Sequence, residues 1–235
     1  GSILDFVISR LGVSLGAARK ELREWANLPF HSAPTLSEPL VHPVQDHKPD
    51  PAKVTRLWNF LERVQVPPYL LSRKIPQSVL TDDRFTDRWR QGRDGVAFPN
   101  WDQHGICGLE FRGDGVKRFL SRSSGAVKGL WFSRNVKTCK RLMVCEAVIN
   151  ALSFHALHVD ATDEIWPLGY VAFGGGLGAL QKELLAELFR QAAERGCEVI
   201  IGVDNDAGGD GYVETLQALS PVALERICPV SNDFN

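Results

Sequence analysis

The C-terminal part of the chain alternates between short apolar runs and longer amphipathic segments. The apolar runs are typical of buried strands, and the segments between them repeat their apolar positions at helical spacing. Strands are predicted at RLMVC (141–145), YVAFGG (170–175) and EVIIGVD (198–204), helices at AVINALSFHALH (147–158), ALQKELLAELFRQAAERG (179–196) and GYVETLQAL (211–219), and a further short strand within LERICPV (224–230). This strict alternation predicts a parallel sheet with right-handed crossovers and helices on both faces.

The first half of the chain has a different pattern. Residues 3–27 have helical spacing that is interrupted at Gly12, which predicts two short helices. Residues 31–51 contain five prolines and no helical or strand period, as in an extended linker. After it we expect an amphipathic helix at AKVTRLWNFLERVQ (52–65), two short helices around a turn at PPYLLSRKIPQSVL (67–80), and β-strands from Gly95 onward with a hairpin at Asp102 to Gly105.

Composition places the chain among ordinary globular proteins. Its 235 residues are 44% hydrophobic and 23% charged. No apolar run approaches the roughly 20 residues of a membrane-spanning helix, and no signal peptide is recognisable, so we expect a cytoplasmic protein without membrane association. The five cysteines are scattered without the spacing of a zinc site or a disulfide framework.

The basic residues are unevenly distributed. The formal net charge of −1 argues against a general polyanion binder. Between residues 112 and 141, however, the one acid is Asp114, against nine basic residues: Arg112, Lys117, Arg118, Arg122, Lys128, Arg134, Lys137, Lys140 and Arg141. A nucleic-acid backbone passing over this stretch and a merely solvated charged face are both compatible with it.

Two aspartates follow the apolar run Val199 to Val203 within EVIIGVDNDAGGDG (198–211). On a continuing strand Asp204 and Asp206 would project from the same face and repel each other unless a cation such as Mg²⁺ lies between them. Asp-Asn-Asp before two glycines is equally good turn and helix-cap chemistry. The motif by itself leaves both interpretations open.

Acidic residues at other strand ends favour the metal site. Glu146 follows RLMVC, and Asp233 lies in VSNDFN near the last residue of the sequence. In parallel sheets, ligands bind at the carboxyl ends of the strands. The glycines after YVAF, Gly174 to Gly176 and Gly178, would let a ligand approach the backbone closely.

This order of motifs resembles the Toprim domain, which bacterial-type primases, topoisomerases and some nucleases share. The shared features are an acid after the first strand, a glycine turn after a middle strand, and Asp-x-Asp-x-Gly-Gly after the next, over about residues 138–235. The resemblance implies that Glu146, Asp204 and Asp206 are the catalytic acids. It also implies that Asp204 and Asp206 hold Mg²⁺ or Mn²⁺, and we expect Glu146 and Asp233 as further metal ligands. Ala147 departs from the glycine usual at that position.

The upstream half is similar to the catalytic core of bacterial replicative primases and of the Toprim-associated proteins of plasmids and phages. The resemblance rests on YLLSRKIPQSVL, RDGVAFPNWDQHGICGLEFRG and VKRFLSRSS. It implies an α+β primase-core subdomain at 53–137 before a Toprim domain at 138–235, with a helical segment at 1–30 and a proline-rich linker at 31–52. It further implies that phosphates of the template or nucleotide bind at Arg93, Arg112, Lys117, Arg118, Gly175 and Gly176.

These resemblances predict primer synthesis. The expected partners are a single-stranded DNA template, nucleoside triphosphates and a replicative helicase, with a zinc ribbon and a helicase-binding part outside this segment. The alternatives are a Toprim metal-dependent nuclease of a mobile element and a nucleic-acid-binding module without catalysis. A topoisomerase is disfavoured, because none of Tyr69, Tyr170 and Tyr212 lies in a separate breakage domain.

Overall fold

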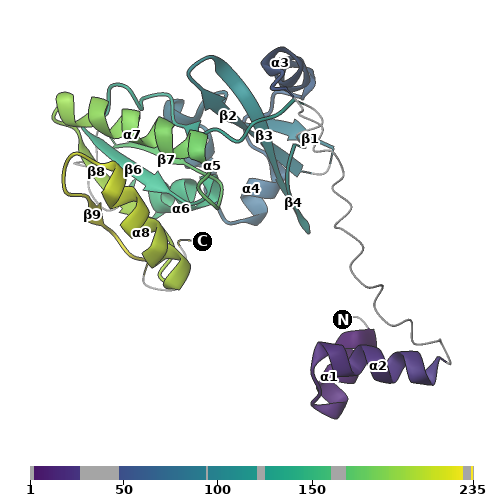
Figure 1. Ribbon diagram of the computed structural model, residues 1–235. Coiled ribbons are helices and arrows are strands. Elements are labelled where there is room, and N and C mark those ends of the chain that lie inside the picture. Colours follow the sequence, from purple (N-terminus) through teal and green to yellow (C-terminus); the bar gives the residue numbers. More distant parts are fainter. Residues whose placement is uncertain are drawn as a thin grey trace. The chain divides into compact units, whose positions relative to one another are not determined.

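The computed structural model describes residues 3–26, 48–93, 95–120, 125–159, 168–229 and 234. By its contacts the chain divides into two units, Gly1–Asp46 and His47–Asn235, which are described separately (Figure 1). Most of the predicted linker at 31–52 lies outside the described residues, and so does Asp233. Within the part of the chain that is described, no helix is both long and apolar enough to cross a membrane.

The first unit contains the two short helices predicted from the sequence, α1 (Ile3–Leu11) and α2 (Leu15–Trp25). Gly12 separates them with a φ of 63°, a conformation that glycine adopts without strain. Ser14 caps α2 by accepting a hydrogen bond from the backbone N–H of Ala17 at 3.4 Å. The expectation of a break at Gly12 is therefore confirmed.

The second unit begins with helices and an antiparallel sheet of order β1-β2-β3-β4. Its elements are α3 (Pro51–Phe60), α4 (Pro68–Ser72), α5 (Gln77–Leu80), the 3₁₀ helix η1 (Asp83–Phe85), β1 (Arg90–Gly92), β2 (Gly95–Asp102), β3 (Gly105–Gly113) and β4 (Val116–Phe119). The hairpin predicted at Asp102 to Gly105 joins β2 to β3. Helix α3 packs on β3 through the buried Val54 and Trp58.

Helix α3 is shorter than its amphipathic pattern predicts, because it ends at Phe60 instead of continuing to residue 65. Leu61 has an extended backbone, with φ −70° and ψ 146°. Glu62 then forms a β-bridge to Gln91, whose N–H donates to the Glu62 carbonyl at 2.9 Å. Pairing with the edge of the sheet therefore takes the place of another helical turn.

The C-terminal sheet has the order β5-β7-β6-β8-β9. Its elements are β5 (Trp131–Phe132), β6 (Arg141–Cys145), α6 (Val148–Val159), β7 (Leu168–Ala172), α7 (Ala179–Glu194), β8 (Glu198–Gly202), α8 (Ala207–Leu219) and β9 (Glu225–Arg226). Strands β6 to β9 pair in parallel as predicted. The edge strand β5 is antiparallel to β7, which the sequence did not predict.

Helices cover both faces of this sheet, as the alternating pattern predicts (Figure 1). In β6, Leu142 and Val144 point into a core with α7 and α8. Met143 and Cys145 point to the opposite face, into a core with α6. The second core also contains Phe85 of η1 together with side chains of α4 and α5, so it joins the two sheets of this unit.

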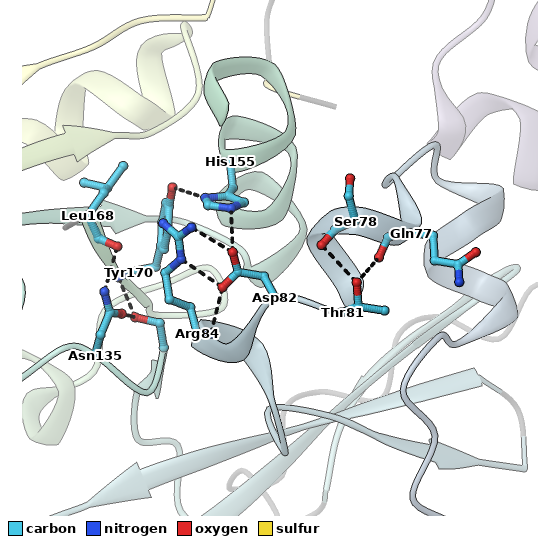
Figure 2. Close-up of polar contacts among 10 residues, drawn as sticks. Gln77, Ser78, Thr81, Asp82, Arg84, Asn135, His155, Leu168 and Tyr170 are labelled. Atoms are coloured by element: carbon cyan, nitrogen blue, oxygen red, sulfur yellow. Dashed lines mark hydrogen bonds and ion pairs between the residues drawn. The ribbon is translucent and has the colours of Figure 1, made fainter. Parts of the chain in front are cut away.

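A buried polar network lies within that shared core (Figure 2). Arg84 holds Asp82 with two side-chain hydrogen bonds of 2.9 and 2.7 Å. His155 Nε2 lies 3.5 Å from the Asp82 carboxylate, and His155 Nδ1 lies 2.9 Å from the Tyr170 hydroxyl. The network therefore connects the segment after α5 to α6 and β7.

Candidate functional site

The three predicted catalytic acids lie at the carboxyl edge of the C-terminal sheet. Glu146 follows β6 directly, and Asp204 and Asp206 follow β8, its hydrogen-bonded parallel neighbour. Burial raises the pKa of Glu146, and the negative charges of Asp204 and Asp206 raise it further. The acids are therefore close enough to repel one another.

The two aspartates do not lie on a strand, which corrects the expectation that strand alternation makes them face the same way. Strand β8 ends at Gly202, and Asp206 is the N-cap of α8. Its Oδ1 accepts a hydrogen bond from the Gly209 N–H at 2.8 Å. The cap interpretation thus holds for Asp206, and it is compatible with the metal interpretation because a carboxylate has two oxygens.

Asp204 is held by contacts with residues distant in sequence. Asn150 of α6 donates a hydrogen bond to Asp204 Oδ1 at 2.8 Å. Arg226 of β9 donates to the Asp204 backbone oxygen at 3.2 Å and to the Asp210 carboxylate at 2.6 Å. A Cβ at Gly209 would lie 1.9 Å from that same backbone oxygen, so the loop needs glycine there. The second glycine of the motif therefore has a packing role.

The glycine turn after β7 lies against Glu146. The N–H groups of Gly174 and Gly175 donate to the Glu146 carbonyl at 2.6 and 3.2 Å, and both glycines have positive φ. Glu146 Oε1 lies 3.7 Å from where a Cβ of Gly175 would be. A Cβ added at Gly176 would have no neighbouring atom within 4 Å. The turn therefore lies directly beside Glu146, and Gly176 is its exposed residue.

Basic side chains of the antiparallel sheet act electrostatically on the acids. The charges of Lys117 and Arg112 lower the pKa of Glu146 and so oppose the effects of burial and of the aspartates. Arg112 forms an ion pair with the buried Glu110 at 2.5 Å. Arg118 occupies the other face of β4, because its guanidinium lies 4.2 Å from the ring centroid of Phe111. Of Lys117 and Arg118, which are both predicted to bind phosphate, Lys117 is the one whose charge acts on Glu146.

Arg93 and Asp233 are the remaining predicted site residues, and the roles of all the predicted site residues stay predictions. Arg93 lies exposed in the turn between β1 and β2. Asp233 lies outside the described residues, although its neighbour Phe234 is buried against Phe154, with ring centroids 5.5 Å apart.

Lys128 is a site residue that sequence reasoning missed. Its ammonium donates to the carbonyls of Gly175 and Gly176 at 2.7 and 3.1 Å. Burial lowers the pKa of Lys128, and the carboxylates of Glu110 and Glu146 oppose that shift. The available signal was a lone cation within the otherwise uncharged segment GAVKGLWF (125–132), which ends with β5.

Asn150 and Tyr212 were also missed. Asn150 is a polar residue in the apolar first turn of α6, four positions after Glu146, and this was its visible signal. Burial and the charges of Glu146, Asp206 and Asp204 raise the pKa of Tyr212, so its phenol lies near the three acids. The ring of Tyr212 packs edge-on against Phe173.

The donor set fits a hard divalent cation. Among the described residues, no group of three His, Cys, Asp or Glu side chains is arranged to enclose an ion. Mg²⁺ does not need such an enclosure, since it keeps several waters and binds through one or two carboxylates together with substrate phosphates. The negative charges of Glu146, Asp204 and Asp206 repel one another, and a bound cation would neutralise them.

Comparison with known proteins agrees with this fold. Residues 143–235 match the Toprim-like family model. The crystal structure of the primase fragment of the bacteriophage T7 primase-helicase protein has a TM-score of 0.50 and 16% identity, covering 74% of this chain and 73% of that chain. A structure of T7 lagging-strand DNA polymerase with primase domains bound to an RNA/DNA hybrid and dTTP has a TM-score of 0.48 and 18% identity, covering 74% and 82%. No curated protein matches the chain.

These comparisons establish the fold. The C-terminal region is a Toprim-like domain, and at 16% identity the likeness to the T7 primase fragment shows a common architecture. The expected fold class, a Toprim domain preceded by a smaller α+β subdomain as in primases, is therefore confirmed.

Proposed function

We propose that this chain is a primase-like nucleotidyltransferase core, which synthesises short primers on single-stranded DNA from nucleoside triphosphates. The observation that carries the proposal is the convergence of two opposite charge sets on one edge. Glu146, Asp204 and Asp206 come from the Toprim-like sheet, whereas Arg112 and Lys117 come from the antiparallel sheet. Polymerisation needs both kinds of charge, because a metal-bound triphosphate and a nucleic-acid strand are held together.

In the proposed reaction a 3′-hydroxyl attacks the α-phosphate of a nucleoside triphosphate. The new bond joins the 3′-oxygen to phosphorus, the bond to pyrophosphate breaks, and the hydroxyl proton is lost. Asp204 and Asp206 would hold Mg²⁺ or Mn²⁺, with Asp233 as a further ligand. When bound, the ion supplies charge neutralisation for the triphosphate and lowers the pKa of the attacking hydroxyl.

The other residues have assigned tasks in this proposal. Glu146 positions and deprotonates the attacking hydroxyl, and its raised pKa suits a group that accepts a proton. Phosphates of the nucleotide and template bind to basic side chains and to exposed backbone. These phosphate-binding residues are Arg93, Arg112, Lys117, Arg118, Lys128, Gly175 and Gly176.

The proposed partners follow from the chemistry. Single-stranded DNA supplies the template and nucleoside triphosphates supply the substrate. A replicative helicase is a proposed protein partner, because the T7 fragment of similar fold comes from a primase-helicase protein.

Measuring metal-dependent triphosphate binding distinguishes primer synthesis from the two alternative functions, a nuclease and a binding module. Glu146→Gln should abolish nucleotide incorporation on single-stranded DNA and leave Mg²⁺- or Mn²⁺-dependent triphosphate binding largely intact. Glu183→Gln, a change at an exposed carboxylate of α7, is the matched control and should leave both intact. Glu146-dependent cleavage of DNA without triphosphate binding would show a nuclease. Strand binding with neither activity would show a binding module.

A further inference from the structure

Two arginines lie on adjoining segments where the two sheets of the second unit join. Arg88 lies between η1 and β1, and Arg134 follows β5. Their segments are fixed by backbone contacts: the Trp131 indole N–H donates to the Arg88 carbonyl at 2.9 Å, and the Arg134 N–H donates to the Arg84 carbonyl at 2.8 Å. Neither arginine belongs to the acid edge, by which we mean the carboxyl end of the C-terminal sheet with Glu146, Asp204 and Asp206.

An aromatic platform supports Arg88. Its guanidinium lies 4.8 Å from the ring centroid of the half-buried Trp101. Trp101 contacts Phe132 with ring centroids 6.3 Å apart, and its backbone pairs with Leu130 through hydrogen bonds of 2.7 and 3.0 Å. The guanidinium of Arg88 therefore lies on an indole ring whose position is fixed by the pairing of Trp101 with Leu130.

The positive charge at this junction is poorly compensated. Burial lowers the pKa of Arg88, and the charge of Arg134 lowers it further. Asp87 opposes these effects, but its carboxylate also lies 3.6 Å from the guanidinium of Arg90. Arg88 Nε is buried and has no hydrogen-bond partner among the described residues. The like charges of the two guanidinium groups, with the Asp87 carboxylate shared with Arg90, favour the binding of an anion.

We propose that Arg88 and Arg134 form a phosphate clamp for single-stranded nucleic acid, separate from the acid edge and supported by Trp101. The clamp rests on the proposed function, since its ligand is the template strand. Guanidinium groups bind phosphate oxygens with paired, parallel hydrogen bonds and contact any sequence equally.

The position of Arg134 favours a nucleic acid over an acidic protein segment. Arg134 lies six residues after Lys128, whose ammonium contacts the glycine turn of the acid edge. Six residues of extended chain span at most about 20 Å. A stacked strand covers that distance with about six nucleotides, at roughly 3.4 Å each. One strand can therefore contact both the clamp and the acid edge.

The test measures binding of a fluorescent 18-nucleotide single strand by anisotropy over a series of salt concentrations, using the full chain. Arg134→Gln, an exposed change, and Arg88→Gln should each weaken binding several-fold. Each should also reduce the log-log salt slope by about 0.7, the value for one lost phosphate contact on a single strand. Arg56→Gln, an exposed change on α3, is the control and should leave affinity and slope unchanged.

The same variants are tested for metal-dependent triphosphate binding, which should not change. Unaltered affinity and slope in Arg134→Gln would overturn the clamp and point to an acidic protein segment as the anion. Failure of the wild-type chain to bind the 18-nucleotide strand would also overturn it. The strand-binding measurement requires no catalysis, so a chain without primer synthesis can still show the clamp, and the triphosphate measurement tests the proposed function separately.

Discussion

Asn150 donates a hydrogen bond from its side chain to Asp204 Oδ1 at 2.8 Å and so connects α6 to the loop after β8, 54 residues later in the sequence. Because α6 begins two residues after Glu146, this contact links the two strand ends that carry the acids. Asn150 is thus a positioning residue for the proposed metal site.

Asn150→Ala should weaken Mn²⁺ binding by about 10- to 100-fold, the usual effect of removing a group that orients a metal ligand. Loss of a buried hydrogen bond to a charged group should also lower the free energy of unfolding by about 1–3 kcal/mol. Calorimetric titration with Mn²⁺ and urea unfolding measure the two effects. Asn59→Ala, at an exposed position of α3, is the control. Unchanged Mn²⁺ affinity in Asn150→Ala would remove Asn150 from the site.

Two glycines of α8 provide a matched pair of substitutions. Gly209→Ala should disrupt the acid loop, because the new Cβ would lie 1.9 Å from the Asp204 carbonyl oxygen. Gly211 has open space around it, so Gly211→Ala should raise helix stability by about 0.5–1 kcal/mol. Thermal unfolding and Mn²⁺ titration of both variants test this contrast. Equal effects of the two substitutions would contradict the packing role of Gly209.

Two substitutions at Asp206 separate its cap role from metal binding. Asparagine is as good an N-cap as aspartate, so Asp206→Asn should keep the helix stable while losing Mn²⁺ affinity. Asp206→Ala should lose both, with a decrease of about 1 kcal/mol in the free energy of unfolding. Crystals soaked in Mn²⁺ should show the ion near Asp204 and Asp206 in the wild-type chain. An ion bound elsewhere would refute the site assignment.

Neighbouring cations on β4 should contribute unequally to nucleotide binding. Lys117 influences the charge of Glu146, whereas Arg118 lies over Phe111 on the opposite face. Lys117→Gln should therefore weaken metal-dependent triphosphate binding more than Arg118→Gln does. Isothermal titration of both variants decides the comparison, and a larger loss in Arg118→Gln would contradict it.

Acidification should destabilise the second unit through the network of Figure 2. Burial lowers the pKa of His155, so the folded state stays unprotonated where the unfolded chain binds a proton, below about pH 6.5. Stability from this residue is present above that pH and is lost as pH falls, by at most about 1.4 kcal/mol per pH unit. For Asp82, burial raises the pKa, but hydrogen bonds from His155 and Arg84 outweigh this effect and lower it. The contribution of Asp82 is therefore lost at still lower pH, below about 4.

The measurement is urea unfolding at pH 7.5 and 5.5. His155→Gln should reduce the difference in unfolding free energy between the two pH values, because the titrating group is removed. His104→Gln, in the exposed hairpin turn, should leave that difference close to wild type. An undiminished difference in His155→Gln would assign the pH dependence to other groups.

The sequence by itself determined most of the C-terminal architecture. Apolar runs such as Val199 to Ile201 identify buried strands because both faces of a covered sheet must be apolar. Parallel strands bring their carboxyl ends to one edge, so the positions of Glu146, Asp204 and Asp206 along the chain were enough to predict their proximity. Local signals also predicted the break at Gly12 and the hairpin between β2 and β3.

Only the tertiary structure decided how that edge is completed. Asn150, Lys128 and Arg226 act through contacts with residues far away in sequence, and no local period reports such contacts. Tertiary pairing also ended α3 at Phe60, because Glu62 bonds to the sheet edge, and it made β5 antiparallel. Asp206 can cap α8 because β8 stops at Gly202. Residue propensities locate the end of a strand only to within a few residues. Long-range hydrogen bonds and charge pairs therefore determined the site, whereas apolar periodicity determined the framework that holds it.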